Sequence, residues 1–130
     1  MPPKYVAGNL ALVPVAKTSA YSLTYQDCGK LFTNRGAGGS VTFTLPKGSA
    51  ALAGFWAEFA TVAAQAIVIA TDPTDTLIVH ADATADSVTT AATIGQHFKA
   101  IYDGTGWFLV SNPSAAPTAT AVTAVTIATA

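Results

Sequence analysis

The sequence has little charge. Only 10% of its 130 residues are charged, and the net charge is −1, whereas about a quarter of an average soluble domain is charged. The basic residues are scattered, so nothing resembles the basic stripe that binds a phosphate backbone, and nucleic acid is not expected as a partner. Because so few charges keep copies apart, the chain is expected to associate with neighbours.

Cysteine and long apolar runs are also scarce. Cys28 is the only cysteine, which excludes an internal disulfide and a cysteine-based metal site. No apolar run approaches the roughly 18–20 residues of a membrane-spanning helix, and Pro2, Pro3 and Pro14 interrupt any signal-peptide core. No membrane partner is therefore expected, and assembly is expected in a reducing cytoplasm.

The sequence does contain repeated alternation of apolar and polar residues, which is typical of half-buried strands. Strands are expected at AYSLTYQD (20–27), SVTFTLP (40–46), about 54–62, 66–70, TLIVHAD (76–82) and DSVTTAAT (86–93). IGQHFKAIYDGTGWFLVS (94–111) predicts a hairpin around its Asp-Gly turn. The pattern predicts one all-β domain, an antiparallel β-sandwich or jelly-roll-like barrel.

The two ends of the chain lack this alternation. Residues 1–19 contain three prolines and widely spaced apolar residues, which indicates an extended arm. Residues 113–130 are a low-complexity Ala/Thr/Pro tail, whose last part can still form a strand against a partner. The expected organisation is an N-terminal arm (1–19), a β-domain (20–112) and a C-terminal arm (113–130).

A glycine cluster in LFTNRGAGGSVTFTLP (31–46) lies close to the pair Gly29-Lys30, which invites comparison with a phosphate-binding loop. Such a loop needs Ser or Thr after the lysine and a helix after the glycines. Here Leu31 follows Lys30, and the glycines precede a strand-like segment. The glycines are therefore predicted to form the turn of a hairpin between two strands.

No catalytic constellation stands out. The aspartates lie mostly in predicted turns, no G-x-S-x-G motif marks a nucleophile, and the two histidines, His80 and His97, lack the spacing of metal ligands. Cys28 is expected to be a small buried residue at a strand end. No enzymatic activity, metal or cofactor is expected, although a small hydrolase remains an alternative if a pocket joins His80 to two aspartates.

The tryptophans leave several interpretations open. In GWFLV (106–110) adjacent positions are apolar, so one face of this strand can meet the core while the other meets a second layer or another subunit. Core packing, a subunit interface and stacking on a sugar ring are all open for Trp107 and Phe108. Trp56 raises the same question.

YSLTYQDCGKLFTNRGAGGSVTFTLP, followed later by IYDGTGWFLVS, resembles a pattern found in structural proteins of tailed bacteriophages. The matching parts are Tyr-x-Leu-Thr, Asp-x-Gly-Lys, an Asn-Arg-Gly loop, Val-Thr-Phe-x-Leu-Pro and the late Asp-Gly hairpin, so the resemblance spans Tyr21 to Asn112. Modules of this kind resemble capsid decoration (cement) proteins and also occur in head and tail fibres. The resemblance implies an antiparallel β-domain that is often trimeric and has no enzymatic activity.

Because 130 residues is short for a fibre with shaft repeats, we expect a complete small decoration protein on the virion surface. It would bind the major capsid protein, bridge neighbouring copies of it, and form a homotrimer. The alternative is a receptor- or glycan-binding module of a phage head or tail fibre. The residues expected to contact the capsid or another subunit are Tyr5, Leu10, Leu12, Val13, Trp56, Trp107, Val122, Val125 and Ile127.

Overall fold

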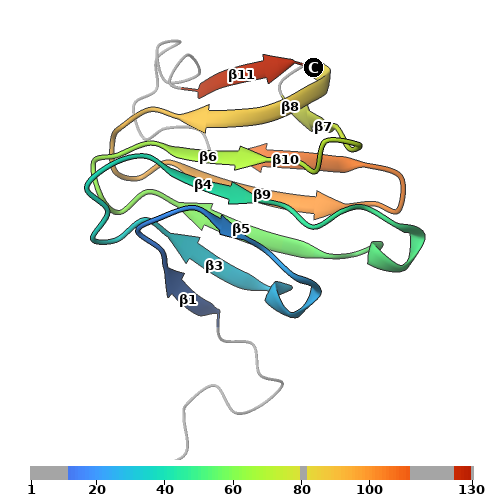
Figure 1. Ribbon diagram of the computed structural model, residues 1–130, viewed down its shortest axis with the longest axis horizontal. Helices are drawn as coiled ribbons and strands as arrows, with labels where there is room; N and C mark the ends of the chain where they lie inside the picture. Colours follow the sequence, from blue (N-terminus) through green and yellow to red (C-terminus); the bar gives the residue numbers. More distant parts are fainter. Residues whose placement is uncertain (1–11, 80–81, 112–124, 130) are drawn as a thin grey trace, which may run out of the picture.

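The computed structural model describes residues 12–79, 82–111 and 125–129, which form one mixed β-sheet with two short 3-10 turns (Figure 1). The strands are β1 (Val13–Ala16), β2 (Tyr21–Ser22), β3 (Lys30–Thr33), β4 (Val41–Thr44), β5 (Trp56–Ala60), β6 (Ile67–Ala70), β7 (Leu77–Val79), β8 (Asp82–Thr90), β9 (His97–Tyr102), β10 (Trp107–Ser111) and β11 (Val125–Thr129). The turns are η2 (Tyr25–Asp27) and η3 (Ala50–Leu52). The predicted all-β class is confirmed. Within the described residues, no helix has the length and apolar character needed to cross a membrane.

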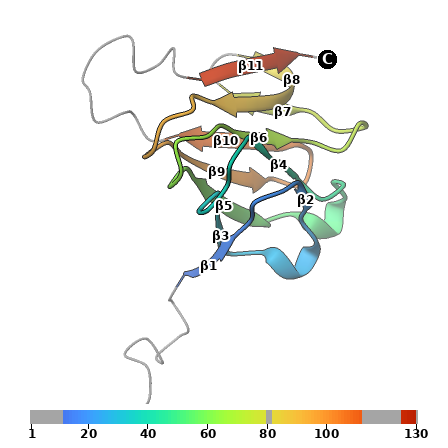
Figure 2. The same ribbon diagram turned by 60° about the vertical axis from the view of Figure 1, so that its left-hand side comes forward.

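From β1 to β6, consecutive strands alternate between two layers (Figures 1 and 2). In the first layer β1, β3 and β5 run parallel to one another, and in the second layer β2, β4 and β6 do the same. β9 and β10 extend the first layer and β8 extends the second, all in antiparallel pairs. The parallel pair of β7 and β10 joins the two layers at one end.

This topology corrects the expected antiparallel sandwich or barrel, because the chain winds as a β-solenoid in its first half. Parallel neighbours always need a crossover connection, which is usually a helix. Here each crossover is a strand of the opposite layer. For that reason the sequence shows no strand–helix–strand rhythm even though parallel pairs are present.

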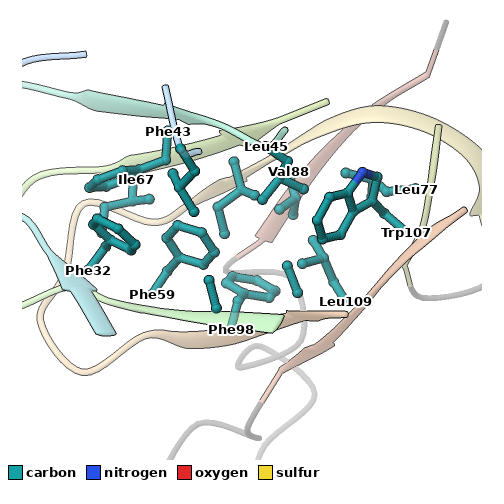
Figure 3. Close-up of a cluster of buried hydrophobic side chains, with 14 of the residues drawn as sticks. Phe32, Phe43, Leu45, Phe59, Ile67, Leu77, Val88, Phe98, Trp107 and Leu109 are labelled. Atoms are coloured by element: carbon teal, nitrogen blue, oxygen red, sulfur yellow. The ribbon is translucent and has the colours of Figure 1, made fainter. Parts of the chain in front are cut away.

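The core lies between the layers and is largely aromatic. The rings of Phe32, Phe43 and Phe59 have centroids 5.3 to 5.8 Å apart, and Figure 3 shows Phe98 beside them. Trp107 is wholly buried at the other end of this cluster. Aromatic pairs at such distances add to the stabilisation from buried area.

The period-two alternation correctly predicted most inward-facing positions. Val41, Phe43 and Leu45 are buried as expected, and so are the alternating apolar residues of β9. The strands expected near 54–62 and 66–70 are β5 and β6, and the predicted hairpin of residues 94–111 is β9 and β10. Ile94, just before β9, departs from this alternation, because 67% of it is exposed.

The glycine segment after β3 is a corner between layers, so the predicted hairpin is wrong. β3 pairs with β1 and β5, whereas β4 pairs with β2 and β6. Phe32 and Phe43 therefore meet across the core instead of along a hairpin. Gly36 has a φ of +86°, a conformation that glycine adopts at little cost.

Buried Asn34 fixes this corner. Its Nδ2 donates hydrogen bonds to the carbonyls of Ala63 (3.3 Å) and Gln65 (2.9 Å), and its Oδ1 accepts from the N–H groups of Val62 (2.8 Å) and Ala63 (2.9 Å). The corner after β3 is thus joined to the corner after β5. One side chain satisfies irregular backbone that has no strand partner.

The strand predicted for residues 20–27 is wrong beyond Ser22. The backbone turns into η2, because the Asp27 carboxylate accepts a hydrogen bond from the Thr24 N–H (2.9 Å). The turn brings Tyr25 to the surface, where 63% of it is exposed, although Leu23 is buried. Here the backbone conformation follows a local side chain–backbone hydrogen bond and not the alternation of apolar residues.

Parts of both expected arms belong to the sheet. β1 lies within residues 1–19 and is the edge strand of the first layer. β11 lies within residues 113–130 and pairs antiparallel with β8 of the same chain, with Ile127 opposite Val88. The strand that was expected to form against a partner thus has an intramolecular partner.

We predict that Gly48→Ala lowers the free energy of unfolding by about 1–3 kcal/mol, because overpacking of a filled core costs that much. A Cβ at this position would lie 2.6 Å from Cζ of buried Tyr102. Gly38→Ala is the matched control, since no atom lies within 4 Å of its added Cβ. Denaturant unfolding of both variants tests this, and equal losses in the two would contradict it.

We predict that Asn34→Ala lowers the free energy of unfolding by about 2–4 kcal/mol, because buried backbone groups lose their hydrogen-bond partners. Asn34→Asp keeps an oxygen acceptor for Val62 and Ala63 but cannot donate to the carbonyls. Asn34→Asp should also lower the free energy of unfolding, by an amount that differs from the decrease in Asn34→Ala. Chemical denaturation measures both, and wild-type stability in Asn34→Ala would disprove the role given to this side chain.

Candidate interaction surface

Four apolar side chains form a continuous row across the outside of the sheet. Trp56 on β5 is directly opposite Ile101 on β9, Ile101 is opposite Phe108 on β10, and Phe108 is opposite Ile78 on β7. Their inward-facing neighbours on the same strands are buried, so all four point away from the core. Three are half-buried, and 51% of Ile78 is exposed. We call these four residues the apolar row.

The next row along the strands carries the charges of this face. Glu58 is opposite Lys99, and Lys99 is opposite Val110, which is 50% exposed. Glu58 Oε1 lies 2.6 Å from His97 Nε2, and Lys99 Nζ lies 4.5 Å from the centre of the Trp56 ring. Each charged group therefore contacts another side chain of the same chain, and Glu58 and Lys99, which have opposite formal charges, lie opposite each other on this face.

The edge of the first layer is poorly suited to accept another strand. The Lys17 N–H donates to the Thr33 carbonyl (3.0 Å), so by alternation Val13 and Val15 also point their backbone groups toward β3. Pro14 then faces the open edge, where it has no N–H to donate. Proline on an edge strand opposes strand addition.

The end of the core beside this edge is covered by a lysine. Lys17 Nζ lies 4.0 Å from the centre of the Tyr21 ring, and Tyr21 packs against Phe32 with a centroid distance of 5.5 Å. The ammonium group remains near water while its stem covers the aromatic ring. Lys17 therefore covers the Tyr21 ring at this end of the solenoid.

An open groove lies between η2 and η3, lined by Tyr25, Cys28 and residues 51–55. Cys28 is exposed, so the expectation of a buried cysteine is wrong. Beside the groove, burial disfavours the charged form of Asp27, but hydrogen bonds from Lys30 Nζ, the Thr24 N–H and the Tyr21 hydroxyl outweigh burial and lower its pKa. Asp27 is thus a buried carboxylate whose hydrogen bonds stabilise η2, and η2 forms one side of the groove.

The residues expected to contact the capsid or another subunit lie in different parts of the structure. Leu12 and Val13 are exposed at the start of β1, by 44% and 53%, and Trp56 belongs to the apolar row. Trp107 is wholly buried, so its side chain packs in the core and is not available to a capsid or subunit. Val125 and Ile127 lie in β11, while Tyr5, Leu10 and Val122 lie outside the described residues.

The part of the chain that the structure describes contains no group of three or more His, Cys, Asp or Glu side chains arranged to hold a metal ion. His80, on which the hydrolase alternative depends, lies outside the described residues. His97 is paired with Glu58 on the sheet surface.

Sequence reasoning missed most of the apolar row. The pattern GWFLV showed that one face of β10 would be apolar and outward, but it left open which of Trp107 and Phe108 that was. Nothing in the local pattern aligned Ile78 or Ile101 with Phe108, because that alignment depends on the pairing of β7, β9 and β10.

The chain was compared with models of known protein families and with curated proteins, and it matches none of them.

We predict that Asp27→Asn destabilises the protein at pH 7 and that this difference shrinks as the pH falls below about 4. The native pKa of Asp27 is lowered, so the carboxylate contributes stability above its unfolded pKa and loses it as the pH falls through the folded pKa. Tyr21→Phe, which removes one donor, should have a smaller effect. Denaturant unfolding between pH 7 and 3 measures this, and a difference independent of pH would contradict it.

Proposed function

We propose that this is a structural virion protein that decorates the outer surface of an assembled bacteriophage head and stabilises it by bridging neighbouring major capsid proteins. The observation that carries the proposal is the apolar row on an outer face without unbalanced charge. Exposed apolar surface of this kind usually marks a contact with another protein. The resemblance of residues 21–112 to phage structural modules supplies the biological setting.

The stabilising effect would follow from mass action. A protein that binds only the assembled shell stabilises that shell by about 2.7 kcal/mol per site when its free concentration is 100 times its Kd. Repeated over many equivalent sites, this opposes disassembly without any chemical step. A packed two-layer sheet suits this role, because pre-organised surfaces usually change little on binding. The expected homotrimer belongs to this proposal through the resemblance.

The second candidate is a receptor- or glycan-binding module. Tyr25, exposed beside the open groove, favours it, because aromatic side chains can stack on sugar rings. The tryptophans favour it less. Trp107 is in the core, and Lys99 lies over the ring of Trp56.

The decoration function predicts binding that depends on assembly. Purified protein added to heads that lack it should sediment with mature, expanded heads and raise their disruption temperature in calorimetry. It should not bind unassembled capsid protein. An unrelated protein of similar size is the control for trapping in the pellet.

Two results would count against this function: equal binding to unassembled capsid protein, or purified virions that carry the protein only in their tails. Glycan binding that is lost in Tyr25→Ala, together with no binding to heads, would instead support the second candidate.

A further inference from the structure

We infer that residues 1–11 bind in the open groove between η2 and η3 of their own chain. The groove is lined by Tyr25, Cys28 and residues 51–55. Residues 1–11 have the sequence MPPKYVAGNLA and precede the described part of the chain. The inference concerns the free protein and goes beyond the proposed function, which depends on the apolar row.

The chain enters the described structure beside this groove. Val13, at the start of β1, is opposite Lys30, which follows Cys28 of the groove wall by two residues. The Gly29 N–H donates to the carbonyl of Trp56 (2.7 Å), and Trp56 directly follows the other wall. The start of β1 thus lies at the end of the sheet that carries the two 3-10 turns (Figure 1).

The segment is long enough to lie along the groove. Residues 5–11 span about 23 Å when extended, at about 3.3 Å per residue. Their attachment beside the groove gives them an effective concentration in the millimolar range. Weak contacts therefore suffice to hold the segment in its own groove. The segment of a second copy has no such advantage, which assigns the groove to the same chain.

The apolar residues of the segment match the lining of the groove. Residues 51–55 contribute alanine, leucine and phenylalanine side chains, and Tyr25 is 63% exposed. The large apolar side chains of the segment are Tyr5, Val6 and Leu10. Their docking would remove apolar surface from water on both sides of the contact.

Charge also favours this segment as the occupant. The connections at the groove end carry more carboxylates than lysines, even without Asp27, which pairs with Lys30. They contain Asp72, Asp75, Asp103 and Lys47. The one charged side chain of the segment is Lys4. At the opposite end the connections, all within the described residues, contain Lys17 and Arg35 and no carboxylate. Complementary charge thus directs Lys4 to the groove end.

The test is the rate at which Cys28 of the full-length chain reacts with iodoacetamide, followed by mass spectrometry. Cys28 is the only cysteine and lines the groove. The triple-serine variant, which combines Tyr5→Ser, Val6→Ser and Leu10→Ser, should react about tenfold faster than the wild type. That ratio corresponds to an open form of about one-tenth of the wild-type molecules. Ile94→Ser, at an exposed isoleucine beyond the opposite end of β9, should react as the wild type does.

A peptide of residues 1–11 gives a second measurement. Added at millimolar concentration to the triple-serine variant, it should slow the reaction of Cys28 again. A peptide that carries the same three serines should not. The protection in the wild type should also be independent of protein concentration, because the segment and the groove belong to one chain. Leu10→Ser alone should give a smaller rise in rate.

Equal rates in the wild type and the triple-serine variant would overturn the inference, because Cys28 is exposed within the described residues and only a cover from outside them would slow its reaction. An equal rise in Ile94→Ser, or protection that appears only at high protein concentration, would also overturn it. Circular dichroism melts separate an uncovered groove from lost folding. Binding to phage heads is measured separately, so its absence would refute the proposed function alone.

Discussion

The packing of Phe32, Phe43 and Phe59 between two sheet layers is the interaction on which the rest of the structure depends. Each ring comes from a different strand, and the strands belong alternately to the first and the second layer. To place all three rings in one core, the chain crosses to the second layer after β3 and back to the first layer after β4. The parallel stacking of β1, β3 and β5, and of β2, β4 and β6, follows from this crossing.

The crossings are short irregular segments, and polar side chains make them stable. Asn34 bonds the corner after β3 to the corner after β5, and the Thr61 hydroxyl donates to the Thr93 carbonyl (2.7 Å) while accepting from the Gln96 N–H (2.9 Å). Each buried backbone group left without such a partner would cost about 1–3 kcal/mol. A small set of polar residues thus holds the corners in register.

Once the register is fixed, the outer face is fixed as well. Every outward residue of β5, β9, β10 and β7 acquires a definite neighbour, and this aligns the apolar row beside the row of Glu58 and Lys99. The same sheet that buries Trp107 exposes part of Phe108, because adjacent residues of a strand point to opposite faces. The outer face therefore combines few charged side chains with an aligned apolar row.

The sequence by itself determined the all-β class, most inward-facing positions and the hairpin of β9 and β10, because alternation and turn chemistry are local properties of the chain. It could not determine which strands lie side by side. The glycine segment after β3 has the composition of a hairpin turn, and Asn34 looks like an ordinary loop residue. Only the tertiary structure decided that the segment is a corner and that Trp107 is buried in the core. It also decided that Ile78 and Trp56 are the two end residues of the apolar row. These outcomes depend on pairing between residues far apart in the chain, which no local pattern encodes.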